Sequence, residues 1–248
     1  MSTTGEITHT LDAAASLDTV FAPVRSQTAF EEAVDRIGTA IRIGLLPPGT
    51  RLPAERELCA KLGIARSTLR QALVALGQSG HLRAIRGRGG GTFVVDELPP
   101  ALPPAANVLE GWRAMWDHRI AAEVGIAVLA CRRAHQSTLM ALAELLVAME
   151  GSVADFAVYR QLDVRFHLGL AESTGNARLI TVATEVQGNA TRLIALIAHP
   201  AEVLSSSNVQ HRRILAAVIS GDEGATAREM AEHLRGTEHI LAGLLPSG

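Results

Sequence analysis

Apolar residues recur at helical spacing near the N-terminus, where we expect the first two helices of the chain. The first helix carries its apolar stripe on Phe30, Val34, Ile37, Ile41 and Leu45. Pro47, Pro48 and Gly49 end this pattern, because neither proline nor glycine favours a continuing helix. The segment "LPAERELCAKLG" predicts a second helix, with Pro53 in its first turn and Gly63 at its end.

A third helix and two short strands are predicted next along the chain. After the short turn "GIA", the segment "RSTLRQALVALGQSG" directs Leu69, Leu73 and Leu76 inward. The following "HLRAIRGRGGGTFVV" contains two β-like runs around a glycine-rich tip. This order predicts a winged helix-turn-helix over residues 26–95, preceded by a mobile arm at residues 1–25.

The second half of the chain has a helical pattern only. Four prolines in "DELPPALPPAAN" indicate a semi-rigid linker at residues 96–106. Beyond it, an all-α bundle is expected over residues 107–243. Its helices are predicted at residues 107–133, 136–150, 153–173, 176–198, 201–220 and 222–243. The predicted fold class is therefore mainly α, with a small β-wing in the N-terminal part.

The net charge of residues 26–95 is opposite in sign to that of the rest of the chain. The chain has a formal net charge of −2, whereas residues 26–95 carry ten Lys or Arg and five Asp or Glu, which leaves −7 for the remainder. No acidic residue lies between Glu57 and Asp96. Such a stretch can be simply a solvated face, but arginine is suited to bidentate contact with phosphate and guanine. We therefore expect nucleic acid as a partner.

The composition excludes several other classes of protein. No apolar run approaches the roughly 20 residues of a membrane span. The N-terminus also lacks the basic-then-apolar order of a signal peptide, so we expect a cytoplasmic protein with no membrane partner. Cys59 and Cys131 have no spacing partner and are expected to be small side chains in the protein interior.

The stretch from "LPPGTRLPAER" through "ARSTLRQAL" to "GRGGGTFVV" resembles the winged helix-turn-helix of the GntR family of bacterial transcription regulators. The resemblance implies that the third helix enters the major groove of DNA and the wing tip the adjacent minor groove. Ala65 departs from the family pattern, because a Ser or Thr usually stands there and caps the recognition helix. The residues at the family's DNA-contacting positions are Arg56, Arg66, Ser67, Thr68, Arg70, Arg86, Gly87 and Arg88.

Four polar residues lie on inward-facing helix stripes of the second half. Asp163 and His167 are one turn apart in "DVRFHLGL", while His211 and His233 belong to the apolar stripes of two further helices. A buried carboxylate needs a partner charge, a metal ion or a catalytic role. One histidine on an apolar face is usually an ordinary core residue, but four polar residues on three stripes favour a buried cation.

The same segments resemble the all-helical FCD domain of the FadR subfamily of GntR regulators, through "DVRFHLGLAESTGNARL", "HRRILAAVISGD" and "AREMAEHL". The resemblance implies that Asp163, His167, His211 and His233 ligate a divalent cation, which can be Zn, Ni, Mn or Fe. It also implies that a small organic acid occupies the open metal positions. Arg119 matches an arginine of the family, although an ion pair with Glu123 explains it equally well. Further candidates for effector binding are Arg192 and Asn208.

These patterns together predict a transcription regulator. We expect a repressor that binds a short palindromic operator as a homodimer and releases it when an organic acid binds at the metal site. The alternative is a metal-dependent enzyme or carrier fused to a DNA-binding module. The sequence contains no "HExxH" or comparable pair, so we expect no enzyme.

Overall fold

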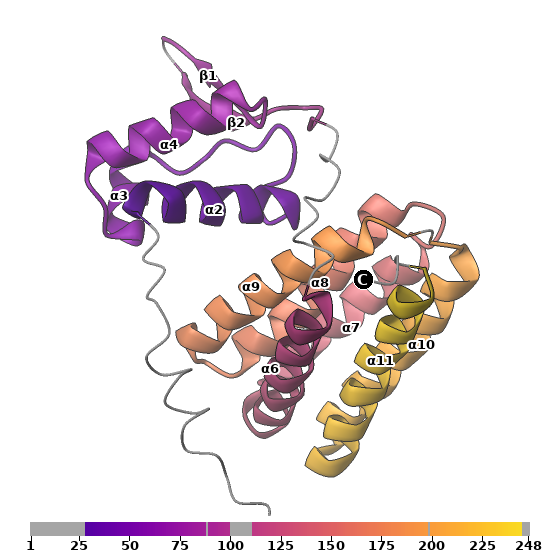
Figure 1. The fold of residues 1–248 in the computed structure, drawn as a ribbon. Coiled ribbons are helices and arrows are strands. Elements are labelled where there is room, and N and C mark those ends of the chain that lie inside the picture. The colour runs from indigo at the N-terminus through magenta and orange to yellow at the C-terminus, as the bar shows by residue number, and fades with distance from the viewer. Residues whose placement is uncertain (1–27, 88, 100–110, 198, 245–248) are drawn as a thin grey trace, which may run out of the picture.

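The computed structural model describes residues 28–87, 89–99, 111–197 and 199–244. Its helices and strands form two groups, an N-terminal winged helix-turn-helix and a C-terminal helical bundle (Figure 1). The predicted fold class is therefore confirmed. The predicted mobile arm at residues 1–25, Arg88 and residues 100–106 of the predicted linker lie outside the described residues. None of the described helices is long and apolar enough to cross a membrane.

Among the described residues, the N-terminal group contains three helices and one hairpin. Its elements are α2 (Ala29–Arg42), α3 (Glu55–Leu62), α4 (Arg66–Gln78), β1 (Leu82–Ile85) and β2 (Gly91–Val94). Thr28 and Glu31 form a capping box at the start of α2. The prediction that Pro53 lies in the first turn of α3 is wrong, because Ala54 is the N-cap and the helix begins one residue later.

A small apolar core joins these elements. The strands β1 and β2 pair antiparallel, with Leu82 opposite Val94. Both side chains are buried against the helices, so the wing is anchored at its base. The other buried members of this core are Ile37, Ile41, Leu52, Leu69 and Leu76.

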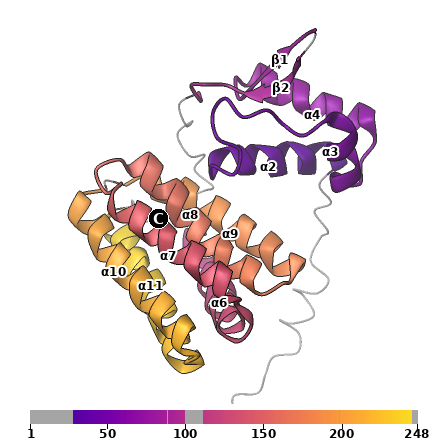
Figure 2. The same cartoon turned by 180° about the vertical axis from the view of Figure 1, so that it is seen from behind.

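The C-terminal group is a bundle of six helices among the described residues. They are α6 (Trp112–Arg133), α7 (Gln136–Glu150), α8 (Phe156–Ser173), α9 (Ala177–Ile194), α10 (Ala201–Ser220) and α11 (Glu223–Leu244). Helix α6 begins at Trp112, directly after Gly111, which has a φ of 80°. Residues 107–110 of the expected first helix lie outside the described residues. Figures 1 and 2 both show α10 and α11 side by side.

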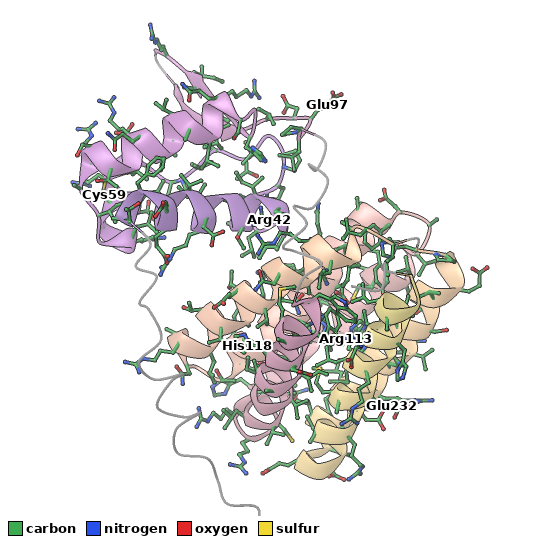
Figure 3. The ribbon with its side chains drawn as sticks, viewed as in Figure 1. Arg42, Cys59, Glu97, Arg113, His118 and Glu232 are labelled. Carbon is green, nitrogen blue, oxygen red and sulfur yellow. The ribbon has the colours of Figure 1, made fainter. Side chains whose placement is uncertain are left out.

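The two groups contact each other through α2 and α9. A Cβ atom on Gly188 would lie only 2.8 Å from the methyl carbon of Thr39, so glycine is needed for this approach of the helices. Ile43, just after α2, is buried in the core of the helical bundle. Figure 3 shows Arg42 at the end of α2 that faces the bundle. The N-terminal group is therefore packed against α9.

Candidate functional site

The four predicted metal ligands converge inside the helical bundle. Asp163 and His167 come from α8, His211 from α10 and His233 from α11, and all four are buried. One potential ligand atom from each residue lies within 4.8 Å of the others. Their helices are brought together by apolar neighbours such as Phe166, which is fully buried. The four residues therefore form a cluster that could hold a metal ion.

The distances within this cluster suit a cation. Nε2 of His211 lies 3.2 Å from Oδ1 of Asp163 and 3.4 Å from Nε2 of His167. Two ligand atoms that are each roughly 2.1 Å from a tetrahedral ion are about 3.4 Å apart. Nε2 of His167 and Oδ1 of Asp163 are wider apart, at 3.9 Å. One carboxylate oxygen and three imidazole nitrogens are the donor set that zinc and related transition metals prefer.

Neighbouring side chains orient two of the imidazoles. Nδ1 of His167 lies 2.5 Å from Oε2 of Glu123, and Nδ1 of His233 lies 3.1 Å from Oε1 of Gln210. Both rings therefore keep Nε2 for a metal, as metal-binding histidines commonly do. Burial lowers the pKa of His233 well below its usual value and also lowers that of His211. Both rings are neutral at neutral pH and offer a lone pair.

Arg160, which the sequence analysis missed, is part of the same site. Its guanidinium group is buried and forms an ion pair with Asp163. It also donates hydrogen bonds to Oε1 of Gln187 at 2.8 Å and to Oγ1 of Thr191 at 2.9 Å, both on α9. The only signal in the sequence is its spacing of three residues from Asp163, which places both side chains on one helix face.

Arg119 forms the expected ion pair with Glu123. Its Nε donates to Oε1 of Glu123 at 2.9 Å, and both side chains are buried. Burial raises the pKa of Glu123, but Arg119 and His167 outweigh this effect and lower it to about 2. Gln187 donates a further hydrogen bond to Oε1 of Glu123 at 2.7 Å, which links this pair to Arg160. Arg119 also lines the cavity described next.

A cavity of about 310 Å³ opens beside the cluster. Its lining includes Asp163 and His233 from the cluster and the two buried arginines, Arg119 and Arg160. Asn208 and Arg192, expected at the effector site, are not among the lining residues. Asn208 is buried but donates to the carbonyl oxygen of Leu146 on α7, at 3.3 Å. Arg192 is exposed, is bonded to Asn189 and faces the groove between α2 and α9.

Most of the described residues expected to contact DNA are exposed on the N-terminal group. Arg66 and Arg70 on α4 are 71% and 64% exposed, and Nε of each lies near Oε2 of Glu55, at 3.0 and 3.5 Å. One carboxylate thus positions both arginines without burying them, which the sequence analysis did not foresee. Arg56 on α3 and Ser67 on α4 are exposed as well, whereas Thr68 is half-buried.

The N-terminus of α4 and the tip of the wing both leave the backbone accessible to a ligand. No side chain caps the N-terminus of α4, because Ala65 occupies the N-cap, as expected. Its first N–H groups therefore remain available to a phosphate. In the wing tip, Arg86 and Gly87 are exposed, and Gly87 has a φ of 95°. A Cβ atom on Gly90 would lie 2.3 Å from a backbone oxygen, so only glycine fits this tight turn.

Comparison with known proteins agrees with both halves of the structure. Residues 29–94 match the model of the family described as bacterial regulatory proteins, gntR family, and residues 114–236 match that of the FCD domain. The chain is 31% identical to RmpR of Mycobacterium gastri, which is described as an HTH-type transcriptional regulator. The alignment spans 214 residues and covers 82% of this chain and 76% of the relative. The chain belongs to the GntR family.

Two further proteins resemble the chain, one in sequence and one in fold. The chain is 28% identical to the HTH-type transcriptional regulator LutR of Bacillus subtilis, over 82% of this chain and 96% of the relative. The solved structure of E. coli McbR/YncC has the same fold, with a TM-score of 0.54, 18% identity, and coverage of 88% of this chain and 99% of that one. The family matches and the relatives in sequence are transcriptional regulators and not enzymes, and the chain is a transcriptional regulator with a DNA-binding helix-turn-helix.

Proposed function

We propose that this regulator is a metal-containing repressor whose operator binding is controlled by a small organic acid. The observation that carries the proposal is the convergence of four buried side chains that could hold a metal, two of which line a cavity together with two buried arginines. A site with neutral imidazoles, a carboxylate and arginines is typical of anion recognition beside a cation.

Charge balance supports an anionic effector. The buried charges of Arg119 and Arg160 are cancelled by those of Glu123 and Asp163. Asp163, with the imidazoles of the cluster, would hold the divalent cation. When bound, this cation would supply uncompensated positive charge and open coordination positions to a carboxylate. The arginines would orient the carboxylate.

On the DNA side, we propose that Arg66 and Arg70 contact base edges. Their exposure and their common partner Glu55 support this role, because arginine bidentate to guanine needs a defined direction. Arg56, Ser67, Thr68 and the wing residues Arg86, Gly87 and Arg88 would contact the backbone and the minor groove. The protein would bind as a homodimer, with two recognition helices roughly 34–36 Å apart on a short palindrome.

Helix α9 provides the connection between the two sites. Gln187 and Thr191 hold Arg160 on one side of this helix. Gly188, adjacent to Gln187, contacts Thr39 of α2 in the DNA-binding group. We infer that an acid whose carboxylate binds Arg160 displaces α9 and thereby changes the orientation of α2.

The experiment begins with duplexes selected by the protein from a random DNA library. Operator affinity is then measured by fluorescence anisotropy for zinc-loaded and chelator-treated protein, each with and without a panel of carboxylic acids. We expect at least one acid to weaken operator binding of the zinc-loaded protein only. If operator affinity were the same under all of these conditions, the proposed regulation by metal and acid would be wrong.

A further inference from the structure

The cavity extends away from the metal-binding cluster along three helices. On α8, Phe156 lies seven residues before Asp163, which corresponds to about 10 Å at the 1.5 Å rise of a helix. On α11, Ile240 lies seven residues beyond His233, and the lining residues of α10 also begin two turns before its cluster histidine. The cavity is therefore elongated, with the cluster at its inner end.

The outer end of the cavity is apolar. Its aliphatic lining consists of Ile194, Ile197, Val203, Leu204 and Ile240. His199 stacks on Phe156, with ring centroids 3.5 Å apart and planes inclined by 6°, and this pair forms an aromatic wall. Burial lowers the pKa of His199, so the ring is neutral at neutral pH. This wall favours contact with an apolar group.

Positive charge is confined to the inner end. Among the described lining residues, the two arginines beside the cluster are the only ones with a permanent positive charge. The charged residue of the outer lining is Glu202, whose carboxylate would repel a second acidic group. Ser206 and Ser207 line the cavity on α10, whereas the hydroxyl group of Thr237 donates to the backbone oxygen of His233. A ligand with one carboxylate and an apolar body matches this distribution.

We propose that the effector is a monocarboxylate with an apolar, aromatic body, and not a short hydroxy acid or a dicarboxylate. The cavity volume of about 310 Å³ lies at the lower end of the range for small-molecule sites, roughly 300–1,000 Å³, which favours a body with a single aromatic ring. The carboxylate lies against Arg160 and the cluster, and the ring lies against Phe156 and His199. This inference rests on the proposed function and names the ligand class of the same site.

The test compares four probes by isothermal titration and thermal shift on the zinc-loaded protein. They are 3-phenylpropanoate, L-lactate, succinate and 3-phenylpropan-1-ol. Relative to 3-phenylpropanoate, lactate lacks the apolar body, succinate carries a second carboxylate, and the alcohol lacks the carboxylate. We expect 3-phenylpropanoate to bind at least about tenfold more tightly than each of the others, because it alone satisfies both ends of the cavity. Equal or tighter binding of lactate or succinate would overturn the inference.

A pair of variants locates the apolar body. Val203→Phe fills the outer end of the cavity, whereas Val209→Phe makes the same change at a residue of α10 that is 40% exposed. We expect the first variant to lose about tenfold or more in affinity for 3-phenylpropanoate with unchanged zinc content, and the second to bind as the wild type does. Unchanged affinity in Val203→Phe would also overturn the inference.

The outcomes separate this inference from the proposed function. If lactate or succinate bound and released the operator, the ligand class would be wrong while the regulator with a metal-linked acid site would stand. If no carboxylate bound to the zinc-loaded protein, both proposals would fail.

Discussion

Replacing Glu123 by glutamine changes the charge of one buried side chain and keeps its shape. Oε1 of Glu123 accepts from Arg119 and Gln187, and Oε2 contacts Nδ1 of His167. Removing one member of a buried ion pair costs about 3–5 kcal/mol, because the other charge remains without compensation. For a chain of this size each kcal/mol lowers the melting temperature by about 2–4 °C, so a decrease of about 6–20 °C is expected without metal.

The same substitution is expected to weaken metal binding. A carboxylate that orients a ligating histidine typically contributes about 10–100-fold to metal affinity. Calorimetric unfolding without metal and competition with a zinc chelator measure the two effects separately, and circular dichroism verifies the fold. Glu144→Gln, an exposed position on α7, is the matched control and should change the stability by no more than about 0.5 kcal/mol. If Glu123→Gln equalled this control in both assays, the assigned role of Glu123 would be refuted.

Three further predictions concern the DNA surface, the metal ligands and the contact between the two groups. Arg66→Ala or Arg70→Ala should each weaken operator binding by roughly 1–3 kcal/mol and relax preference at one base pair, whereas unaltered affinity in both would remove them from the interface. His211→Ala and His233→Ala should each lower the metal content, measured by mass spectrometry, from about one divalent ion per chain, and full retention in both would mean that other residues bind the ion. Gly188→Ala should leave acid binding intact but reduce the effect of the acid on operator affinity, because its methyl group would collide with α2. Wild-type coupling in that variant would contradict a role for this contact.

Helix positions were predictable where local signals mark both ends. The structure has α10 at Ala201–Ser220, as expected, because Pro200 precedes its first turn and Gly221, with a φ of 73°, ends it. The burial of the four cluster residues was equally accessible, because each lies on an inward helix stripe, whereas their meeting in one site was implied by the family resemblance. Pro53 shows the limit of such signals, since it precedes α3 by two residues.

Contacts between helices left no comparable signal in the sequence. Arg160 reaches Gln187, 27 residues away on α9, and nothing in either segment indicates the partner. Asn208, one turn before His211, was expected at the effector site, but spacing does not reveal that this face of α10 also packs on α7. Arg192 lies on the side of α9 that faces α2, so its surroundings depend on the packing of the two groups.

The most direct test of the central claim is a measurement of reciprocal linkage. Operator affinity of the zinc-loaded protein is determined with and without a saturating carboxylic acid, and the affinity for that acid is determined with and without saturating operator. The account predicts that the acid weakens operator binding by a factor typical of allosteric coupling, about 5–150-fold, and that operator weakens acid binding by the same factor. An acid that saturates the cavity and leaves operator affinity unchanged would contradict it.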